Sequence, residues 1–104
     1  MLFLKRLRKV VRTMDVYEQA AEKIIKEQEN VIGPLALEQA RQVSGLQVDQ
    51  SNHVSFKGDK VDTLDRLVAQ YRQLFGQTSV EVCREAAHGL LGKLPAQEVP
   101  SLLR

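Results

Sequence analysis

The sequence predicts a mostly α-helical protein with a small β-hairpin, at the margin of the α+β class. Two patterns predict the helices: an alternating repeat of apolar residues in the first quarter of the chain, and a capped apolar stripe after residue 59. Between them, two short segments alternate apolar and polar residues, which is typical of a hairpin. We therefore expect a long amphipathic N-terminal helix, a short helix, the hairpin and a C-terminal antiparallel helix pair, within a single domain over residues 1–104.

The first helix is predicted over residues 2–28. Its apolar positions follow the a and d spacing of a heptad repeat, which is typical of a helix that packs lengthwise on other helices. We expect residues 1–14 to continue this helix as an amphipathic arm. The alternative is two helices with a break at residues 13–15, because Asp15 and Glu18 have the spacing of a capping box. The seam consists of Phe3, Leu7, Val10, Met14, Tyr17, Ala21 and Ile24.

The charge of the chain is unevenly distributed. The chain has fifteen basic and thirteen acidic residues and a net charge of +2. Residues 1–12 hold five of the basic residues and no acidic one, so the remaining ten basic and thirteen acidic residues leave a net charge of −3. A basic arm on a mildly acidic body can contact an acidic protein surface, a nucleic acid or a membrane. The arm residues are Lys5, Arg6, Arg8, Lys9 and Arg12.

The middle of the chain predicts a short helix followed by the hairpin. Pro34 suits the first position of a helix that ends near Gly45. Leu46–Val48 and Val54–Phe56 are the predicted strands, and Asn52 is the candidate left-handed residue of the turn. One face of the hairpin, which we expect to lie on the helices, carries Leu46, Val48, Val54 and Phe56.

The C-terminal half predicts two connected helices. Asp59 is the expected N-cap of a helix over residues 60–75, which ends at Gly76. Thr78 and Glu81 have the spacing of a capping box for the next helix. Such a short link makes the two helices close antiparallel neighbours.

No motif in the sequence specifies a reaction. Cys83 and His88 lie five residues apart on a predicted helix, and therefore on different faces, while His53 lies in a predicted turn. Cys83 is the single cysteine, and we expect it to be a small core residue. We predict no catalytic residue, no metal site, no cofactor and no enzymatic activity.

These features favour a non-catalytic protein-interaction module, such as a small subunit, adaptor or regulator. The coiled-coil-like seam would contact a protein partner or a second copy through Phe3, Leu7, Val10, Met14 and Tyr17. The alternative is that the seam packs within this chain, as part of its own core. One alternative is a nucleic-acid-binding regulator of the winged-helix type, in which the helix after Pro34 reads the DNA and the hairpin is the wing. Another is a peripheral membrane protein that binds through residues 1–12.

The expected location is the cytoplasm, with the cytoplasmic face of a membrane as the alternative. No apolar run approaches the roughly 20 residues that span a bilayer. The single cysteine favours a reducing compartment.

Overall fold

Helices dominate the computed structural model, which describes residues 15–104, and a single two-stranded hairpin accompanies them there. This confirms the predicted fold class. The elements are α2 (Val16–Ile32), α3 (Leu35–Arg41), β1 (Leu46–Val48), β2 (Val54–Phe56), α4 (Lys60–Phe75), α5 (Gln77–Leu91) and the 3-10 turns η1 (Ala96–Glu98) and η2 (Ser101–Leu103). None of these helices is long and apolar enough to cross a bilayer.

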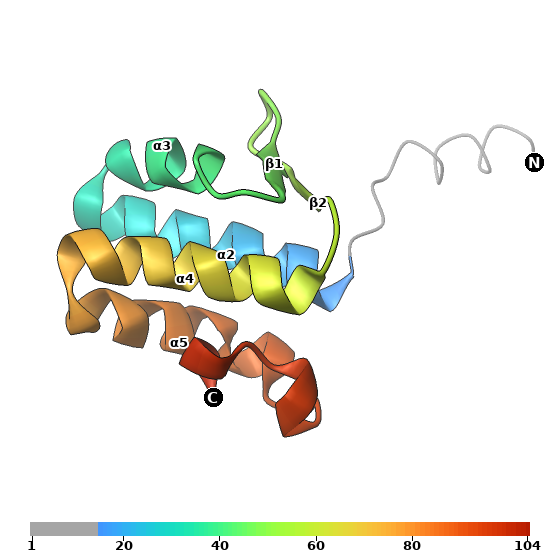
Figure 1. Ribbon diagram of the computed structural model, residues 1–104. Helices are drawn as coiled ribbons and strands as arrows, with labels where there is room; N and C mark the ends of the chain where they lie inside the picture. Colours follow the sequence, from blue (N-terminus) through green and yellow to red (C-terminus); the bar gives the residue numbers. More distant parts are fainter. Residues whose placement is uncertain (1–14) are drawn as a thin grey trace, which may run out of the picture.

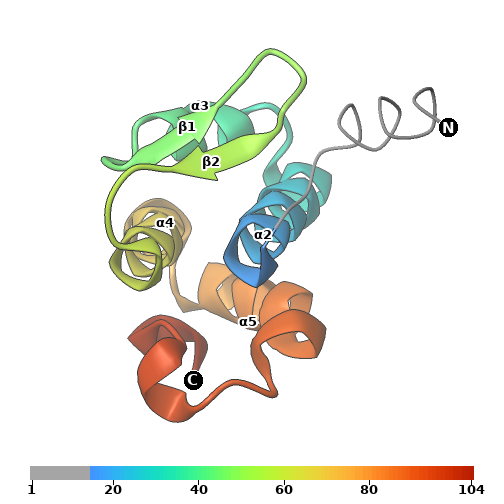
Figure 2. The same cartoon turned by 90° about the vertical axis from the view of Figure 1, so that its right-hand side faces the viewer.

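The elements form three layers (Figures 1 and 2). The hairpin and α3 lie on one side of α2 and α4, and α5 with the C-terminal tail lies on the other. α4 and α5 are antiparallel neighbours, as the short link predicts (Figure 1). The core lies between the layers, and its largest fully buried side chains include Ile24, Leu64, Leu67 and Tyr71.

A complete capping box starts α2. The Asp15 carboxylate accepts a hydrogen bond from the backbone N–H of Glu18 at 2.8 Å, and the Glu18 carboxylate accepts one from the N–H of Asp15 at 3.2 Å. The backbone of Asp15 is extended, with a ψ of 174°, so Asp15 is the N-cap and α2 begins directly after it. This agrees with the alternative in which a helix starts here. The part of the expected helix before residue 15 lies outside the described residues. At its other end α2 continues to Ile32, beyond the expected end near residue 28.

The hairpin has the predicted bounds. Its strands are antiparallel, with Leu46 opposite Phe56 and Val48 opposite Val54. Asn52 has a φ of +64°, the left-handed conformation that the turn requires. Leu46 and Val54 are buried and the other two apolar residues are half-buried against the core, so one face of the hairpin covers the helices.

The joint between α4 and α5 differs from the prediction. The start of α4 is as expected, since the Asp59 carboxylate accepts a hydrogen bond from the N–H of Asp62. The predicted capping box of Thr78 and Glu81 is wrong, because α5 begins at Gln77 without a side-chain cap. Gly76 alone makes the turn at a φ of +82°, which an L side chain rarely adopts, so Thr78 already lies in the first helical turn.

The tail after Gly92 folds back over α4 and α5 (Figure 2). The Asp65 carboxylate of α4 holds it by accepting hydrogen bonds from the Ser101 hydroxyl and the Leu102 N–H, both at 2.9 Å. Leu102 and Leu103 are half-buried against the core. The tail is therefore part of the packed structure.

Candidate functional site

Most residues of the predicted contact surface lie outside the described residues. This holds for Phe3, Leu7, Val10 and Met14 of the seam and for the basic arm, Lys5, Arg6, Arg8, Lys9 and Arg12. Tyr17 lies in the first turn of α2, where it is half-buried against the core, and its hydroxyl donates a hydrogen bond to the Glu98 carbonyl at 2.6 Å. Burial raises the pKa of the Tyr17 phenol, and nearby carboxylates add to this effect.

The seam residues that follow Tyr17 belong to the interior of the protein. Ala21 and Ile24 are fully buried in the core. Gln28, at the next position of the same four-three spacing, is also fully buried. The C-terminal half of the seam therefore contributes to the core of this chain.

The N-terminal end of α2 is tied to α4 by an ion pair. The Lys60 ammonium donates a hydrogen bond to the Asp15 carboxylate. Partial burial opposes ionisation of Asp15, but the hydrogen bonds from Lys60 and from the Glu18 N–H outweigh it and lower the pKa of this carboxyl. The same hydrogen bond raises the pKa of Lys60. The start of α2 is thus fixed to the start of α4.

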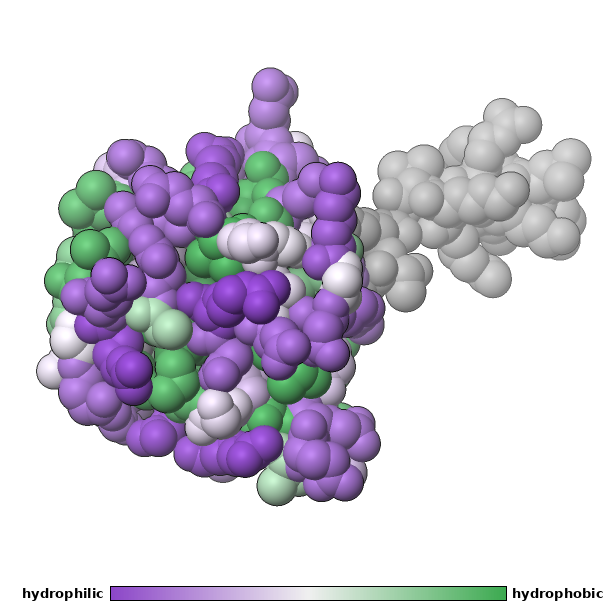
Figure 3. All heavy atoms as spheres, viewed as in Figure 1, coloured by the Kyte–Doolittle hydropathy of each residue, from purple (hydrophilic) through white to green (hydrophobic). Residues whose placement is uncertain are grey.

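The opposite end of the helices exposes large apolar side chains. Val31 near the end of α2 is 64% exposed, Leu35 at the start of α3 is 45% exposed and Leu74 near the end of α4 is 49% exposed. Figure 1 shows these helix ends together, and Figure 3 shows hydrophobic atoms gathered there at the left edge of the molecule. We call this surface the open end. Apolar side chains grouped at one end are typical of a contact surface rather than of isolated surface residues.

Two grooves adjoin the open end, and both are lined by apolar and charged side chains together. One has a volume of about 410 Å³ and is lined by Lys23, Glu27, Val31, Val82, Glu85 and Ala86. The other has a volume of about 500 Å³ and is lined by Glu29, Gly33, Pro34, Leu37, Glu38 and Arg41. This mixture suits an amphipathic partner better than a purely apolar one.

A third cavity lies between the end of α5 and the tail. We call it the tail cavity; its volume is about 270 Å³. The Arg104 Nε donates hydrogen bonds to the carbonyls of Ala96 at 3.0 Å and Val99 at 3.2 Å, which fixes the guanidinium group at its edge. The cavity is lined by Ala87, His88, Leu91, Gly92, Leu94, Ala96, Val99, Leu103 and Arg104. Sequence reasoning missed it, because no local pattern shows where the tail folds back.

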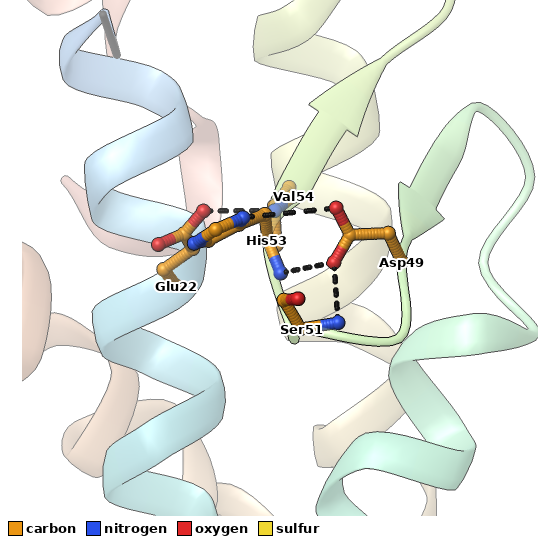
Figure 4. A network of polar contacts seen from close by, with 5 residues as sticks. All are labelled: Glu22, Asp49, Ser51, His53 and Val54. Carbon is orange, nitrogen blue, oxygen red and sulfur yellow. Dashed lines mark hydrogen bonds and ion pairs between the residues drawn. The ribbon is translucent and has the colours of Figure 1, made fainter. Parts of the chain in front are cut away.

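A polar network orders the hairpin turn and joins it to α2 (Figure 4). The Asp49 carboxylate accepts hydrogen bonds from the N–H groups of Ser51 at 2.8 Å and His53 at 3.0 Å, and lies 3.7 Å from the His53 Nδ1. The Glu22 carboxylate of α2 accepts a hydrogen bond from the Val54 N–H at 2.8 Å. The backbone donors in this network indicate a structural role in the turn.

The single cysteine is a core residue, as predicted. Cys83 is fully buried, and its sulfur accepts a hydrogen bond from the Gln28 side-chain amide at 3.2 Å. The same amide donates to the Ser79 carbonyl at 2.9 Å. Burial raises the pKa of the Cys83 thiol to about 11, so at neutral pH it stays protonated and is a poor nucleophile.

The described part of the chain contains no group of three His, Cys, Asp or Glu residues placed to hold a metal ion. No family model, curated protein or solved structure matches this chain. Functional inference therefore starts from the surfaces described above.

Proposed function

We propose that this protein is a non-catalytic interaction module that docks onto a protein partner through the N-terminal part of its seam. The observation that carries this proposal is the helix start at Asp15, which divides the seam. Tyr17 and the seam residues after it are used within the chain's own core. Phe3, Leu7, Val10 and Met14 continue the seam toward the N-terminus, and apolar side chains gain free energy when a partner surface removes them from water.

The open end supports the same class of function. Its three exposed apolar side chains lie beside grooves lined by apolar and charged side chains together, and this mixture is common in interfaces that form and dissociate. The basic arm adds a charge that favours an acidic partner surface and speeds association with it. We infer a role as a small subunit or regulator from these surfaces.

The winged-helix alternative has less support from the described residues. α3 has seven residues, and both Ala36 and Ala40 are buried in it. Glu38 and Arg41 give it one charge of each sign, and Asp49 adds a negative charge at the turn of the hairpin. A phosphate backbone selects for clusters of positive charge, which this helix and hairpin do not offer.

Substitution of Leu7 by Asp in the full-length chain tests the proposal. Affinity isolation from cells with the wild-type chain, with Leu7→Asp and with a matched Leu2→Asp control would identify a partner that depends on the seam. Leu2 lies next to the seam but outside it. We expect Leu7→Asp to lose the partner, or self-association in a concentration series of solution mass, while Leu2→Asp retains it.

The same pair of variants separates the alternatives. Insertion into a lipid surface uses both leucines, so both variants would lose sedimentation with anionic vesicles. Binding to nucleic acid would depend on the basic arm and weaken with salt, whichever leucine is changed. Equal effects of Leu7→Asp and Leu2→Asp on partner binding would contradict docking through the seam, and so would unfolding of the whole chain by Leu7→Asp.

A further inference from the structure

We propose that the tail cavity is a binding site for a small amphipathic anion, an apolar chain that ends in a carboxylate. No described residue of the seam or of the open end lines this cavity, and the inference does not depend on the proposed function. The cavity lies between the last turn of α5 and the tail, with apolar walls and basic side chains at its edge. Its walls and its edge are complementary to different parts of the same molecule.

The walls suit an apolar chain. Leu91 and Val99 are 2% and 8% exposed, and Leu94 and Leu103 are half-buried against the core. Waters along apolar walls find few hydrogen-bond partners, and an alkyl chain that replaces them gains free energy. The volume of about 270 Å³ lies slightly below the range of small-molecule sites, which begins at about 300 Å³, so the cavity suits a small ligand.

The edge suits an anionic head group. Among the described residues that line the cavity, His88 and Arg104 are the two with ionisable side chains, and both are basic. The Arg104 guanidinium is fixed through its Nε by the Ala96 and Val99 carbonyls. Its terminal nitrogens have the geometry that binds a carboxylate through two parallel hydrogen bonds, and an imidazole N–H supplies a further donor. Glu98 belongs to η1 but does not line the cavity.

Octanoate is a suitable probe, with octanol and octylammonium as matched ligands that share the chain and differ in the head group. In amide NMR spectra of the full-length protein, we expect saturable octanoate shifts that concentrate on Leu91, Leu94 and Val99. Octylammonium should bind more weakly by a factor of at least about three, because a partly exposed charge interaction contributes a modest free energy. Shifts that do not saturate, that spread over the whole chain, or that are as strong with octylammonium would overturn the proposal.

Two variants and one matched control test whether the ligand binds in the cavity. Ala96→Trp fills the cavity from its exposed edge, and we expect about a tenfold loss of octanoate affinity. Gln97→Trp adds the same bulk next to it at an exposed residue that does not line the cavity, and should leave the affinity unchanged. Arg104→Gln removes the fixed charge without filling the cavity, and should weaken octanoate but not octanol. Equal affinity in the wild type, Ala96→Trp and Arg104→Gln would show that octanoate binds elsewhere.

Discussion

The two ends of the helical layers differ in how the chain covers its apolar side chains. At the end where α2 and α4 begin, the tail folds over the helices, and Leu102 and Leu103 pack against the core. At the open end, Val31, Leu35 and Leu74 remain exposed. The connections explain this difference. Two residues join α2 to α3 and Gly76 alone joins α4 to α5, so no length of chain is left there to fold over the helix ends.

Burial of an apolar side chain in this protein therefore depends on the length of the neighbouring connection as well as on apolar character. The hairpin and the tail, the long excursions of the described chain, both return to the helices and cover them (Figure 2). An apolar residue beside a one- or two-residue joint has no such cover. The following substitutions test this comparison.

The first test makes the same substitution, leucine to alanine, at the two ends. Leu91 at the covered end is 2% exposed, so Leu91→Ala removes a packed side chain and leaves a void, at a cost of about 3 kcal/mol in the free energy of unfolding. Leu74→Ala at the open end should cost less than about 1 kcal/mol. Urea denaturation of both variants measures the two costs. Equal losses would mean that the open end is covered in solution.

The contact that holds the tail should contribute less. Asp65→Ala removes the acceptor of the Ser101 hydroxyl and the Leu102 N–H, and we expect a loss of about 1 to 2 kcal/mol. Asp62→Ala, an exposed carboxylate one turn earlier, is the matched control and should cost only a few tenths of a kcal/mol. Amide hydrogen exchange should show faster exchange of Leu102 in Asp65→Ala alone. Unchanged exchange would show that packing alone holds the tail.

Local patterns in the sequence predicted most of the described elements. The hairpin bounds, the left-handed Asn52 and the Asp59 cap follow from residues close together in the chain, and so does the helix over 60–75. The apolar stripe also identified the core positions of that helix, such as Leu64 and Leu67. Local chemistry decides these features, so a single sequence contains them.

Features that depend on tertiary contacts were not predictable in the same way. The tail cavity forms because Asp65 and the tail meet, and no short-range pattern specifies that contact. Gln28 continues the seam spacing from Ile24 and is fully buried, but a polar residue at such a position gives no apolar signal from which its burial could be predicted. The Thr78 cap was wrong since one glycine can reverse the chain, and the helix then starts before the capping residue.

The helix starts provide a third test. Asp15→Ala removes a capping box and the partner of Lys60, and should cost about 1 kcal/mol. Thr78→Ala should be close to neutral, because Thr78 makes no cap at the start of α5. Asp15→Asn keeps a capping acceptor and loses the charge. Thermal unfolding of the three variants measures their stabilities. A larger loss of stability for Thr78→Ala than for Asp15→Ala would contradict the assignment of a side-chain cap to α2 and not to α5.

The charge of Asp15 also predicts a dependence on pH. The pKa of this carboxyl is lowered in the folded state, so ionised Asp15 stabilises the protein above the ordinary pKa of an aspartic acid. That stabilisation is lost as the pH falls through the lowered folded-state pKa. The difference in Tm between the wild type and Asp15→Asn should therefore shrink on acidification below about pH 4. If the difference in Tm stays constant down to pH 2, the charge of Asp15 is not its cause.

The smallest expected effect is a charge placed at the open end. Val31 is 64% exposed, so the ammonium of Val31→Lys stays in water, and the free energy of unfolding should change by less than about 0.5 kcal/mol. Val80→Lys puts the same side chain at a position that is 1% exposed and should prevent folding, because a buried ammonium without a partner is strongly destabilising. A loss above about 1 kcal/mol in Val31→Lys would show that the isolated protein already covers this end. Without such a loss, the open end stays available, and Val31→Lys becomes the variant that separates partner binding at this surface from docking through the seam.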